Sequence, residues 1–326
     1  MAKRNLTRRR FMKDTAMLGA AAAALKAADE AGAAAKAPGK LPTIELGKLK
    51  VSRLILGSNP FFGFAHRGGS KLAEKMKAYY TDERICAVLD EAASLGVTAV
   101  AAPPYDRWIK LFGKYLEGGG KLRIWIAQPD PGPGQMKRAI TAAAKGGAKA
   151  VFIQGACADH QFGRKGFDTL RGWLEHIRSF SLPAGLGSHR PDTHCEYERR
   201  KLPTDFYFQC FFQAHLGRYV MKHRDLAVAA IRKIDKPVIG YKILAAGRLD
   251  PKEAFPFALK HLRPKDGVCV GVYPPEKKTM IAEDAALTAK LSVGIAINCP
   301  SAFRGGRCGS ARPAGRTPVP AGRSRA

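Results

Sequence analysis

Short apolar runs recur along this chain at eight places, most of them ending in polar residues, and helix-like stretches separate them. In order, the runs are Arg53–Asn59, Val97–Ala102, Leu122–Gln128, Ala150–Gln154, Pro183–Ser188, Asp205–Cys210, Pro237–Lys242 and Val268–Tyr273. Strands that alternate with helical patterns indicate parallel βαβ units, and eight such units are enough to close a TIM barrel. We therefore predict an α/β chain with a (β/α)8 TIM barrel over residues 41–293, and an N-terminal hairpin at Thr43–Val51 that plugs the bottom of the barrel.

The stretches between the runs carry apolar residues at helical spacing. One predicted helix opens at Thr81 and ends at Gly96. Another has an apolar stripe through Leu226, Ala229 and Ile231. We expect these stripes to face the barrel as core, with no role in binding a cofactor.

In a TIM barrel the loops that follow the strands build the active site. The polar residues at those positions are therefore the ones to examine. They are Ser58, Asn59, Tyr105, Asp106, Gln128, Asp130, Gln154, His160, Ser188, His189, Gln209, Lys242 and Tyr273.

The N-terminus carries the pattern of an exported protein. Thr7–Lys13 reads TRRRFMK, which fits the twin-arginine motif, and the Ala-rich stretch Thr15–Leu25 is too short to span a bilayer. Ala31–Ala33 then offers small residues for cleavage. We predict a twin-arginine signal peptide and linker over residues 1–40, with the twin-arginine translocase and signal peptidase as partners and the periplasm as destination. The alternative is a basic, Ala-rich leader without a targeting role.

The net charge of +28 comes in large part from the two ends of the chain. Residues 1–40 hold nine Lys or Arg and three acidic residues, and residues 297–326 hold six Arg and no acidic residue, so these ends supply 12 of the 28 charges. The rest is spread over helix-surface positions of the barrel, and no nucleic-acid-binding motif accompanies it. We expect no nucleic-acid partner and no stable membrane span.

The composition changes near the C-terminus. Residues 294–326 are rich in Arg, Gly and Pro and carry no apolar periodicity, which predicts a disordered tail. A second hypothesis is that this part of the gene is read in a wrong frame, which resequencing would decide. The seven cysteines form no CxxC pair, so we predict neither a disulfide nor a metal site from them.

The region Glu45–Gly57 resembles the opening hairpin and first strand of the aldo/keto reductases. Gln209 lies where the sixth strand of that family presents a Gln beneath the nicotinamide, and Gly240–Arg248 is similar to its seventh strand and following loop. The resemblance can be laid along residues 42–290. It implies a (β/α)8 barrel, a small-molecule carbonyl or sugar-like substrate, and NADP as the cofactor.

The chain departs from the residues that the family uses for carbonyl reduction. Ala101 stands in place of the family's Asp, Asp106 (beside Tyr105) in place of the Tyr acid, Gln128 in place of the Lys, and Gln154 in place of the His. A phenol near its reference pKa of about 10 needs a cationic neighbour to donate a proton at neutral pH. The usual proton-transfer route is therefore lost.

The family's phosphate clamp is also reduced. Met280 occupies the place of the family's Arg, ahead of Glu283 and Asp284. Lys277 or Lys278 is then the residue left to reach a phosphate.

Two sets of site residues follow from the loops and from the resemblance. The candidate catalytic residues are Asp106, Tyr105, Lys242 and His189. The candidate cofactor-binding residues are Gln209, Ser188, Gln154, Gln128, Tyr241 and Glu283.

Several of these residues allow two interpretations. Lys242 is either a Schiff-base nucleophile in apolar surroundings or one half of a salt bridge with Asp106 or Asp130. His160 and His189 are candidate metal ligands together with Asp106 or Asp159, but no HxH spacing supports a metal here. His194 lies in a helix-like stretch with charges of both signs, Asp192–Lys201, and is expected at the surface. The loop Ser58–His66, with three Phe residues, either stacks on a flat ligand or packs beneath itself.

Three functions stay open. The first is a divergent NAD(P)-dependent oxidoreductase. The second is an enzyme without nicotinamide (a lyase, isomerase or hydrolase) that uses Lys242, Asp106 and His189. The third is a non-catalytic barrel that binds a small molecule. The Gln at position 209 favours the first, and the lost catalytic residues favour the other two.

Overall fold

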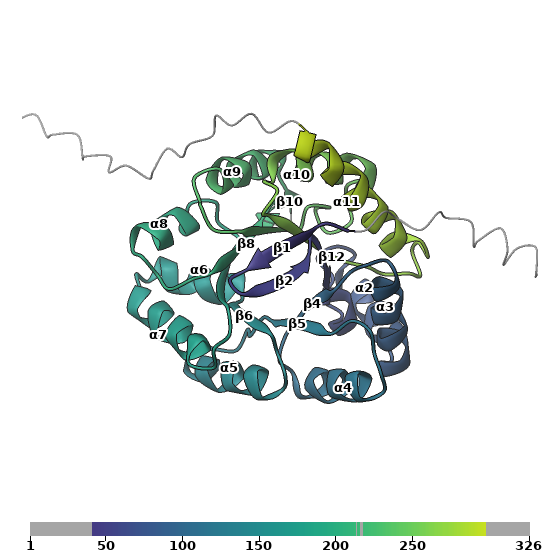
Figure 1. Ribbon diagram of the computed structural model, residues 1–326, viewed down its shortest axis with the longest axis horizontal. Coiled ribbons are helices and arrows are strands. Elements are labelled where there is room, and N and C mark those ends of the chain that lie inside the picture. The colour runs from purple at the N-terminus through teal and green to yellow at the C-terminus, as the bar shows by residue number, and fades with distance from the viewer. Residues whose placement is uncertain (1–40, 213, 216–217, 298–326) are drawn as a thin grey trace, which may run out of the picture. The chain divides into compact units, whose positions relative to one another are not determined.

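The chain folds as the barrel that the apolar runs predict. The computed structural model describes residues 41–212, 214–215 and 218–297, and within them eight parallel strands close on themselves, β12 pairing with β3 (Figure 1). In barrel order the strands are β3 (Leu54–Gly57), β4 (Ala99–Ala102), β5 (Ile124–Ala127), β6 (Ala150–Ile153), β7 (Ala184–Ser188), β8 (Phe206–Cys210), β11 (Val238–Tyr241) and β12 (Gly267–Gly271). Each strand lies within its predicted run or one residue outside it. The fold-class prediction is confirmed.

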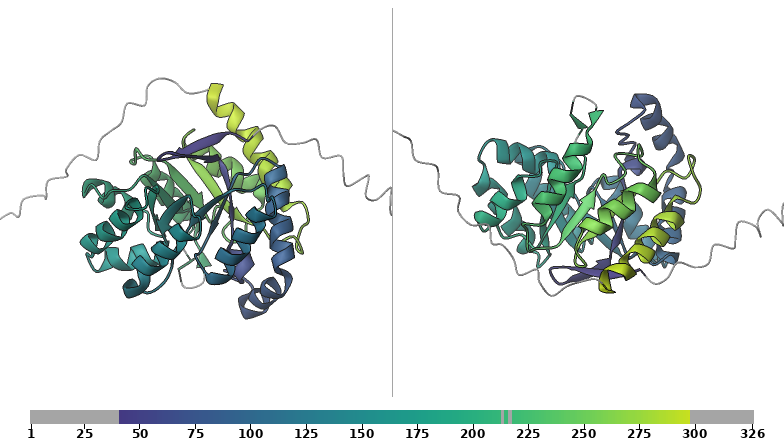
Figure 2. Two further views of the ribbon diagram at one scale, coloured as in Figure 1. Left: turned by 60° about the horizontal axis from the view of Figure 1, so that its bottom comes forward. Right: turned by 90° about the horizontal axis from the view of Figure 1, so that it is seen from above.

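The predicted N-terminal hairpin is confirmed as well. β1 (Thr43–Leu46) and β2 (Leu49–Ser52) pair antiparallel, and Ile44, Leu46 and Val51 are buried with the side chains that fill the barrel. The hairpin, purple in Figure 2, lies across one end of the barrel. It therefore closes the end opposite to the loops that follow the strands.

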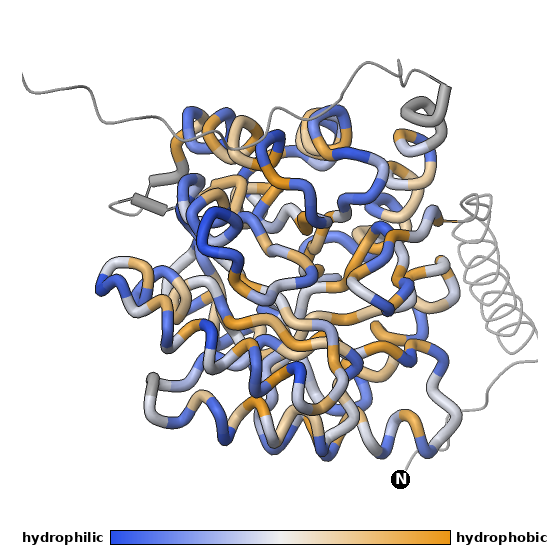
Figure 3. Tube along the Cα trace, turned by 60° about the vertical axis from the view of Figure 1, so that its left-hand side comes forward, coloured by the Kyte–Doolittle hydropathy of each residue, from blue (hydrophilic) through white to orange (hydrophobic). Residues whose placement is uncertain are grey.

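Ten α-helices and two 3-10 turns accompany the strands in the described residues. They are η1 (Asn59–Phe62), α2 (Gly69–Tyr79), α3 (Asp82–Ser94), α4 (Asp106–Glu117), η2 (Pro133–Gln135), α5 (Met136–Lys145), α6 (Gly155–Gly163), α7 (Phe167–Arg178), α8 (Thr193–Arg199), α9 (Met221–Ile231), α10 (Pro251–His261) and α11 (Met280–Ile297). A short hairpin of β9 (Ala214–His215) and β10 (Arg218–Tyr219) precedes α9. Hydrophobic and hydrophilic positions alternate along the helices in Figure 3, as helices with one face on a barrel require.

Two layers of apolar side chains make the core. Inside the barrel the rings of Phe152 and Phe208 stack at 3.9 Å between centroids, surrounded by smaller residues such as Ala99 and Ala101. A larger cluster, which includes Trp108 and Trp125, lies between the strands and the helices. The apolar side chains thus fill the barrel itself, so a ligand has to enter at an end.

Two details differ from the sequence analysis. Leu226 is 43% exposed, because α9 buries the stripe through Ala227, Ala230 and Ile231 instead. His194, expected on the surface, is fully buried, and its Nε2 lies 3.2 Å from the carbonyl oxygen of Phe208. Burial lowers the pKa of His194 to about 4, so its ring is neutral near pH 7.

The predicted signal segment (1–40) and nearly all of the predicted tail (294–326) lie outside the described residues, and the division of the chain stays a prediction. A search of the described helices for one that could cross a bilayer was negative. Within the same residues the five cysteines are free thiols.

A buried ionic cluster ties the chain together where the barrel closes. The Asp266 carboxylate, just before β12, accepts hydrogen bonds from the backbone N–H of Val238 (2.9 Å) and from the Arg263 guanidinium (2.8 and 2.9 Å). The buried Arg53 side chain, at the start of β3, donates to the Asp266 carbonyl oxygen (2.9 Å) and to the Ser292 hydroxyl of α11 (3.0 Å). This Asp266 cluster links β11, β12, β3 and the last helix.

Removal of the Asp266 charge is expected to destabilise the barrel strongly. Asp266→Asn leaves Arg53 buried without a counter-charge, so we expect the free energy of unfolding to fall by about 3 kcal/mol or more. The matched control is Asp235→Asn on an exposed loop, which should change it by less than about 0.5 kcal/mol. Urea unfolding followed by circular dichroism measures both, and equal midpoints would contradict the assigned role.

Candidate active site

A cavity of about 340 Å³ opens among the loops that follow the strands. It takes its walls from the segments after β3, β5, β6, β7, β11 and β12 and from the start of α11. Phe64, Phe152, Phe208 and Leu244 give it an apolar lining. The polar side chains of the lining are Ser58, Asn59, His66, Arg67, Gln128, Gln154, His189, Tyr241, Lys242, Tyr273, Glu276, Lys277, Glu283 and Asp284.

Lys242 follows β11 directly and lines this cavity. Its backbone has a φ of +55°, which L-residues rarely adopt, so the loop and not the strand geometry sets the direction of the side chain. Burial lowers the pKa of its amine, and Cys210 opposes the shift. Within the residues that the structure describes, the ammonium has neither a hydrogen-bond nor an ion-pair partner.

The predicted salt bridge of Lys242 with Asp106 or Asp130 is therefore not formed. Asp130 instead accepts a hydrogen bond of 2.7 Å from the Tyr105 hydroxyl. Asp106 begins α4 and is exposed. An amine that is desolvated and lacks a counter-ion in the described residues is available to a ligand.

His66, in the loop after β3, lines the same cavity, and charged residues nearby influence its protonation. Burial is the largest cause that lowers its pKa to about 4, and the charges of Lys242, His189 and Arg248 add to the shift. Its Nε2 lies 3.3 Å from the Asn59 amide. His66 is thus a neutral hydrogen-bonding group above about pH 4.

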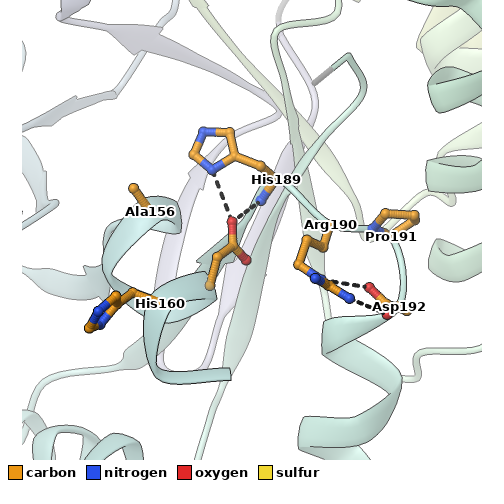
Figure 4. A pocket seen from close by; sticks show the side chains of 7 residues that line it. Ala156, His160, His189, Arg190, Pro191 and Asp192 are labelled. Carbon is orange, nitrogen blue, oxygen red and sulfur yellow. Dashed lines mark hydrogen bonds and ion pairs between the residues drawn. The ribbon is translucent and has the colours of Figure 1, made fainter. Parts of the chain in front are cut away.

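His189 is held by a carboxylate from the neighbouring helix, α6. Its Nδ1 and its backbone N–H lie 3.1 and 2.9 Å from Asp159 Oδ2 (Figure 4). The other oxygen, Asp159 Oδ1, accepts a hydrogen bond of 2.5 Å from the Ser188 hydroxyl. Asp159 Oδ2 therefore fixes the orientation of the imidazole, and the Ser188 hydroxyl holds the carboxylate through Oδ1.

Tyr241 packs edge-on against the His189 ring, with 5.7 Å between centroids. Its hydroxyl donates to the Ser188 carbonyl oxygen at 3.0 Å. Both side chains cross directly over Gly155, where an added Cβ would lie 2.9 Å from His189 Cε1 and 2.9 Å from Tyr241 Oη. The first residue of α6 thus has to be glycine for this arrangement.

Two predicted catalytic residues do not reach the cavity lining. Tyr105 and Asp106 are absent from it, and the bond to Asp130 occupies the Tyr105 hydroxyl. Burial first, and Asp130 second, raise the pKa of Tyr105, which makes it a weaker acid. Of the four predicted catalytic residues, the structure brings only Lys242 and His189 to the cavity described here.

The predicted cofactor residues divide in the same way. Tyr241, Gln128, Gln154 and Glu283 line the cavity, whereas Ser188 and Gln209 are buried and do not. The Gln154 side chain already accepts hydrogen bonds from the first backbone N–H groups of α6 and so caps that helix.

The remaining polar wall lies at the start of α11. Glu283 forms an ion pair with Lys277 at 2.5 Å, so this lysine is already neutralised. Burial, with repulsion from Glu283, raises the pKa of Asp284 to about 8. Near neutral pH Asp284 therefore holds a proton on most molecules.

The phenylalanines of the loop after β3 divide between the two predicted roles, packing in the core and lining the cavity. Phe61 is fully buried in the core, whereas Phe64 is 41% exposed and lines the cavity. Sequence reasoning named Asp159 and His189 together only as possible metal ligands and did not identify the hydrogen bond between them, because residue types 30 positions apart do not show how α6 and the loop after β7 meet. In the described residues no cluster of three or more His, Cys, Asp or Glu side chains is placed to hold a metal.

Comparison with known proteins supports the fold. No protein-family model and no curated protein matches the chain. A solved structure, a putative aldo-keto reductase from Pseudomonas aeruginosa, is similar over 77% of this chain and 94% of its own, with a TM-score of 0.52 and 17% identity. At this identity the likeness establishes a shared barrel fold, and the function has to be argued from the cavity.

Proposed function

We propose that the chain is a divergent oxidoreductase with an aldo/keto-reductase-like barrel that acts on a small carbonyl or sugar-like substrate. The observation that carries this proposal is Lys242, an amine without a partner in the described residues, in a cavity with largely apolar walls. A polar group of this kind fixes the orientation of a small ligand in an apolar pocket. The name of the structural neighbour, a putative aldo-keto reductase, agrees with a carbonyl substrate.

In this proposal Lys242 is the acid that donates a proton to the carbonyl oxygen, the role that the aldo/keto reductases give to a tyrosine. In carbonyl reduction the oxygen gains a proton as the carbon is reduced, so the site needs an acid that gives up its proton near neutral pH. Burial lowers the pKa of Lys242, which makes its ammonium a stronger acid than an exposed lysine. No cationic neighbour of a phenol is then required, which accounts for glutamines at positions 128 and 154.

Two features fit the ring of a nicotinamide cofactor, which supplies a hydride when bound. Tyr241 offers an aromatic wall in the cavity. Gln209 Oε1 is a buried acceptor without a hydrogen-bond partner in the described residues, as a carboxamide donor would require, but Gln209 does not line the cavity, so a bound ring would have to displace the side chains between them. NADP is the cofactor that we propose on the family resemblance.

A second candidate function follows from the same amine. Desolvation increases the neutral fraction of Lys242, and a neutral amine attacks a carbonyl carbon to form a Schiff base. The chain would then be a lyase or isomerase that needs no nicotinamide. A barrel that only binds a small molecule would show neither activity.

Lys242 should be the preferred site of carbonyl trapping. With limiting glycolaldehyde and cyanoborohydride, its amine condenses with the aldehyde, loses water and is reduced to a secondary amine. Peptide mass spectrometry should find this mass at Lys242 ahead of the exposed lysines, and at lower pH, because its lowered pKa leaves more neutral amine. Lys242→Met should remove the preferred label, and the control Lys71→Met, on the exposed face of α2, should keep it. Equal labelling of Lys242 and Lys71 would contradict the proposal.

Nicotinamide binding separates the two candidate functions. Titration of NADPH and NADH into the protein, followed by nicotinamide fluorescence, should show binding. Tyr241→Phe should retain it, because the ring is kept, and Tyr241→Leu should weaken it about two- to tenfold. No binding at millimolar cofactor would overturn the oxidoreductase and leave the Schiff-base function.

We also propose that the chain is exported to the periplasm through the twin-arginine pathway, which moves folded proteins. The motif Thr7–Lys13 and the following Ala-rich stretch support this proposal. In a bacterium that has the pathway, the full chain should be found in the periplasmic fraction. Replacing Arg8 and Arg9 by Lys together should retain it in the cytoplasm, and an unchanged distribution would contradict export.

A further inference from the structure

His189, which Asp159 holds in place, is a second polar group of the cavity, and the proposed proton transfer from Lys242 does not use it. His189 Nδ1 is committed to Asp159 Oδ2 at 3.1 Å, and the backbone N–H of His189 binds the same oxygen. In Figure 4 the second ring nitrogen, Nε2, points away from this carboxylate. Nε2 has no hydrogen-bond partner in the described part of the chain, and His189 lines the cavity.

The surroundings of the pair hold it in one orientation. Asp159 is fixed by the Ser188 hydroxyl, and the His189 ring packs against Tyr241. Gly155 lies beneath both rings with no room for a side chain. A surface histidine with a chance carboxylate neighbour would not need a glycine below it, so the arrangement has the properties of a positioned base.

The position of the pair relative to Lys242 defines what it would act on. His189, Lys242 and His66 all line one cavity of about 340 Å³. The charges of His189 and Lys242 both lower the pKa of His66, in agreement with this shared location. A ligand whose carbonyl oxygen meets Lys242 therefore presents its adjacent carbon within the same small space. On that carbon a base finds an acidic hydrogen, because the carbonyl stabilises the resulting negative charge.

We propose that Asp159 and His189 form a proton-transfer dyad that enolises an α-hydroxycarbonyl compound bound at Lys242. His189 Nε2 takes the proton from the carbon next to the carbonyl, and the C–H electron pair becomes the C=C bond of an enediol. The carbonyl π electrons move to oxygen, which takes a proton from the Lys242 ammonium. Reversal of these steps returns the proton to the same carbon. When the neutral Lys242 amine instead takes the proton of the other enediol hydroxyl and protonated His189 delivers its proton to the former carbonyl carbon, the isomeric compound forms, and in neither case is an oxidant or cofactor consumed. Asp159 acts as a positioning residue.

This inference rests on the proposed function, because Lys242 has to hold the carbonyl. It adds a substrate class, the α-hydroxycarbonyl compounds to which small sugars belong. It also predicts an activity that needs no nicotinamide, which allows it to be tested separately.

The test is deuterium uptake by dihydroxyacetone in D₂O in the presence of the full chain. Proton NMR follows the uptake, and a sample without protein gives the background rate. The protein should accelerate loss of the C–H signal, and His189→Gln should slow it by about 10²-fold or more. Asp159→Asn should slow it as well, and Asp159→Glu should restore part of the rate. Added imidazole should restore exchange to His189→Ala, which a purely structural role of the ring would not predict.

The matched control is His160→Gln. His160 is the next residue to Asp159 on α6, is exposed, and points away from His189 in Figure 4. Its variant should exchange at the rate of the unmodified protein.

Carbonyl trapping at Lys242 distinguishes the two ways in which the inference can fail. Preferred trapping at Lys242 without deuterium uptake, or uptake that His189→Gln leaves unchanged, would overturn the dyad and leave the proposed function in place. Neither trapping nor uptake would overturn both. Trapping retained in His189→Gln together with lost uptake is the result that we expect.

Discussion

A buried carboxylate, Asp266, holds the barrel closed at the point where its last strand meets its first. Its oxygens bind the Val238 N–H and the Arg263 guanidinium, and the Arg53 side chain reaches its carbonyl oxygen. Arg53 and Asp266 lie 213 positions apart in the sequence. The cluster therefore joins the beginning and the end of the part of the chain that forms the barrel. The cluster and the β1–β2 hairpin occupy the end at which the strands begin. The loops after the strands are therefore free to carry chemistry without supporting the closure.

The loop after β11 illustrates that freedom. Lys242, Ala245 and Ala246 all have positive φ values, which cost L-residues about 1–2 kcal/mol each. Hydrogen bonds inside the turn, from Ala245 N–H to the Lys242 carbonyl and from Gly247 N–H to the Leu244 carbonyl, hold this conformation. A stable barrel below the loop can support such strain, and its result is an amine directed to the cavity.

The sequence was sufficient for the barrel and insufficient for the site, for physical reasons that particular residues make clear. Runs such as Ala150–Gln154 identify strands because a strand buried on both faces is apolar throughout. A residue type at a strand end does not reveal which way its side chain turns. Gln209 is at its predicted position, yet its amide donates to the Cys210 carbonyl and stays out of the cavity lining. The hydrogen bond between Asp159 and His189 was equally unpredictable, because it depends on how α6 and the loop after β7 meet.

The positions at which the chain differs from the aldo/keto reductases and the proposed role of Lys242 have one common physical explanation. A tyrosine acid requires a nearby cation to lower its pKa, and Gln128 supplies none. Burial shifts the pKa of a lysine in the opposite direction from that of a tyrosine, because the charged form of lysine is the protonated one. The same desolvation therefore weakens Tyr105 as an acid and strengthens Lys242. For the proposed proton transfer to a carbonyl oxygen, burial therefore favours a lysine over a tyrosine as the acid.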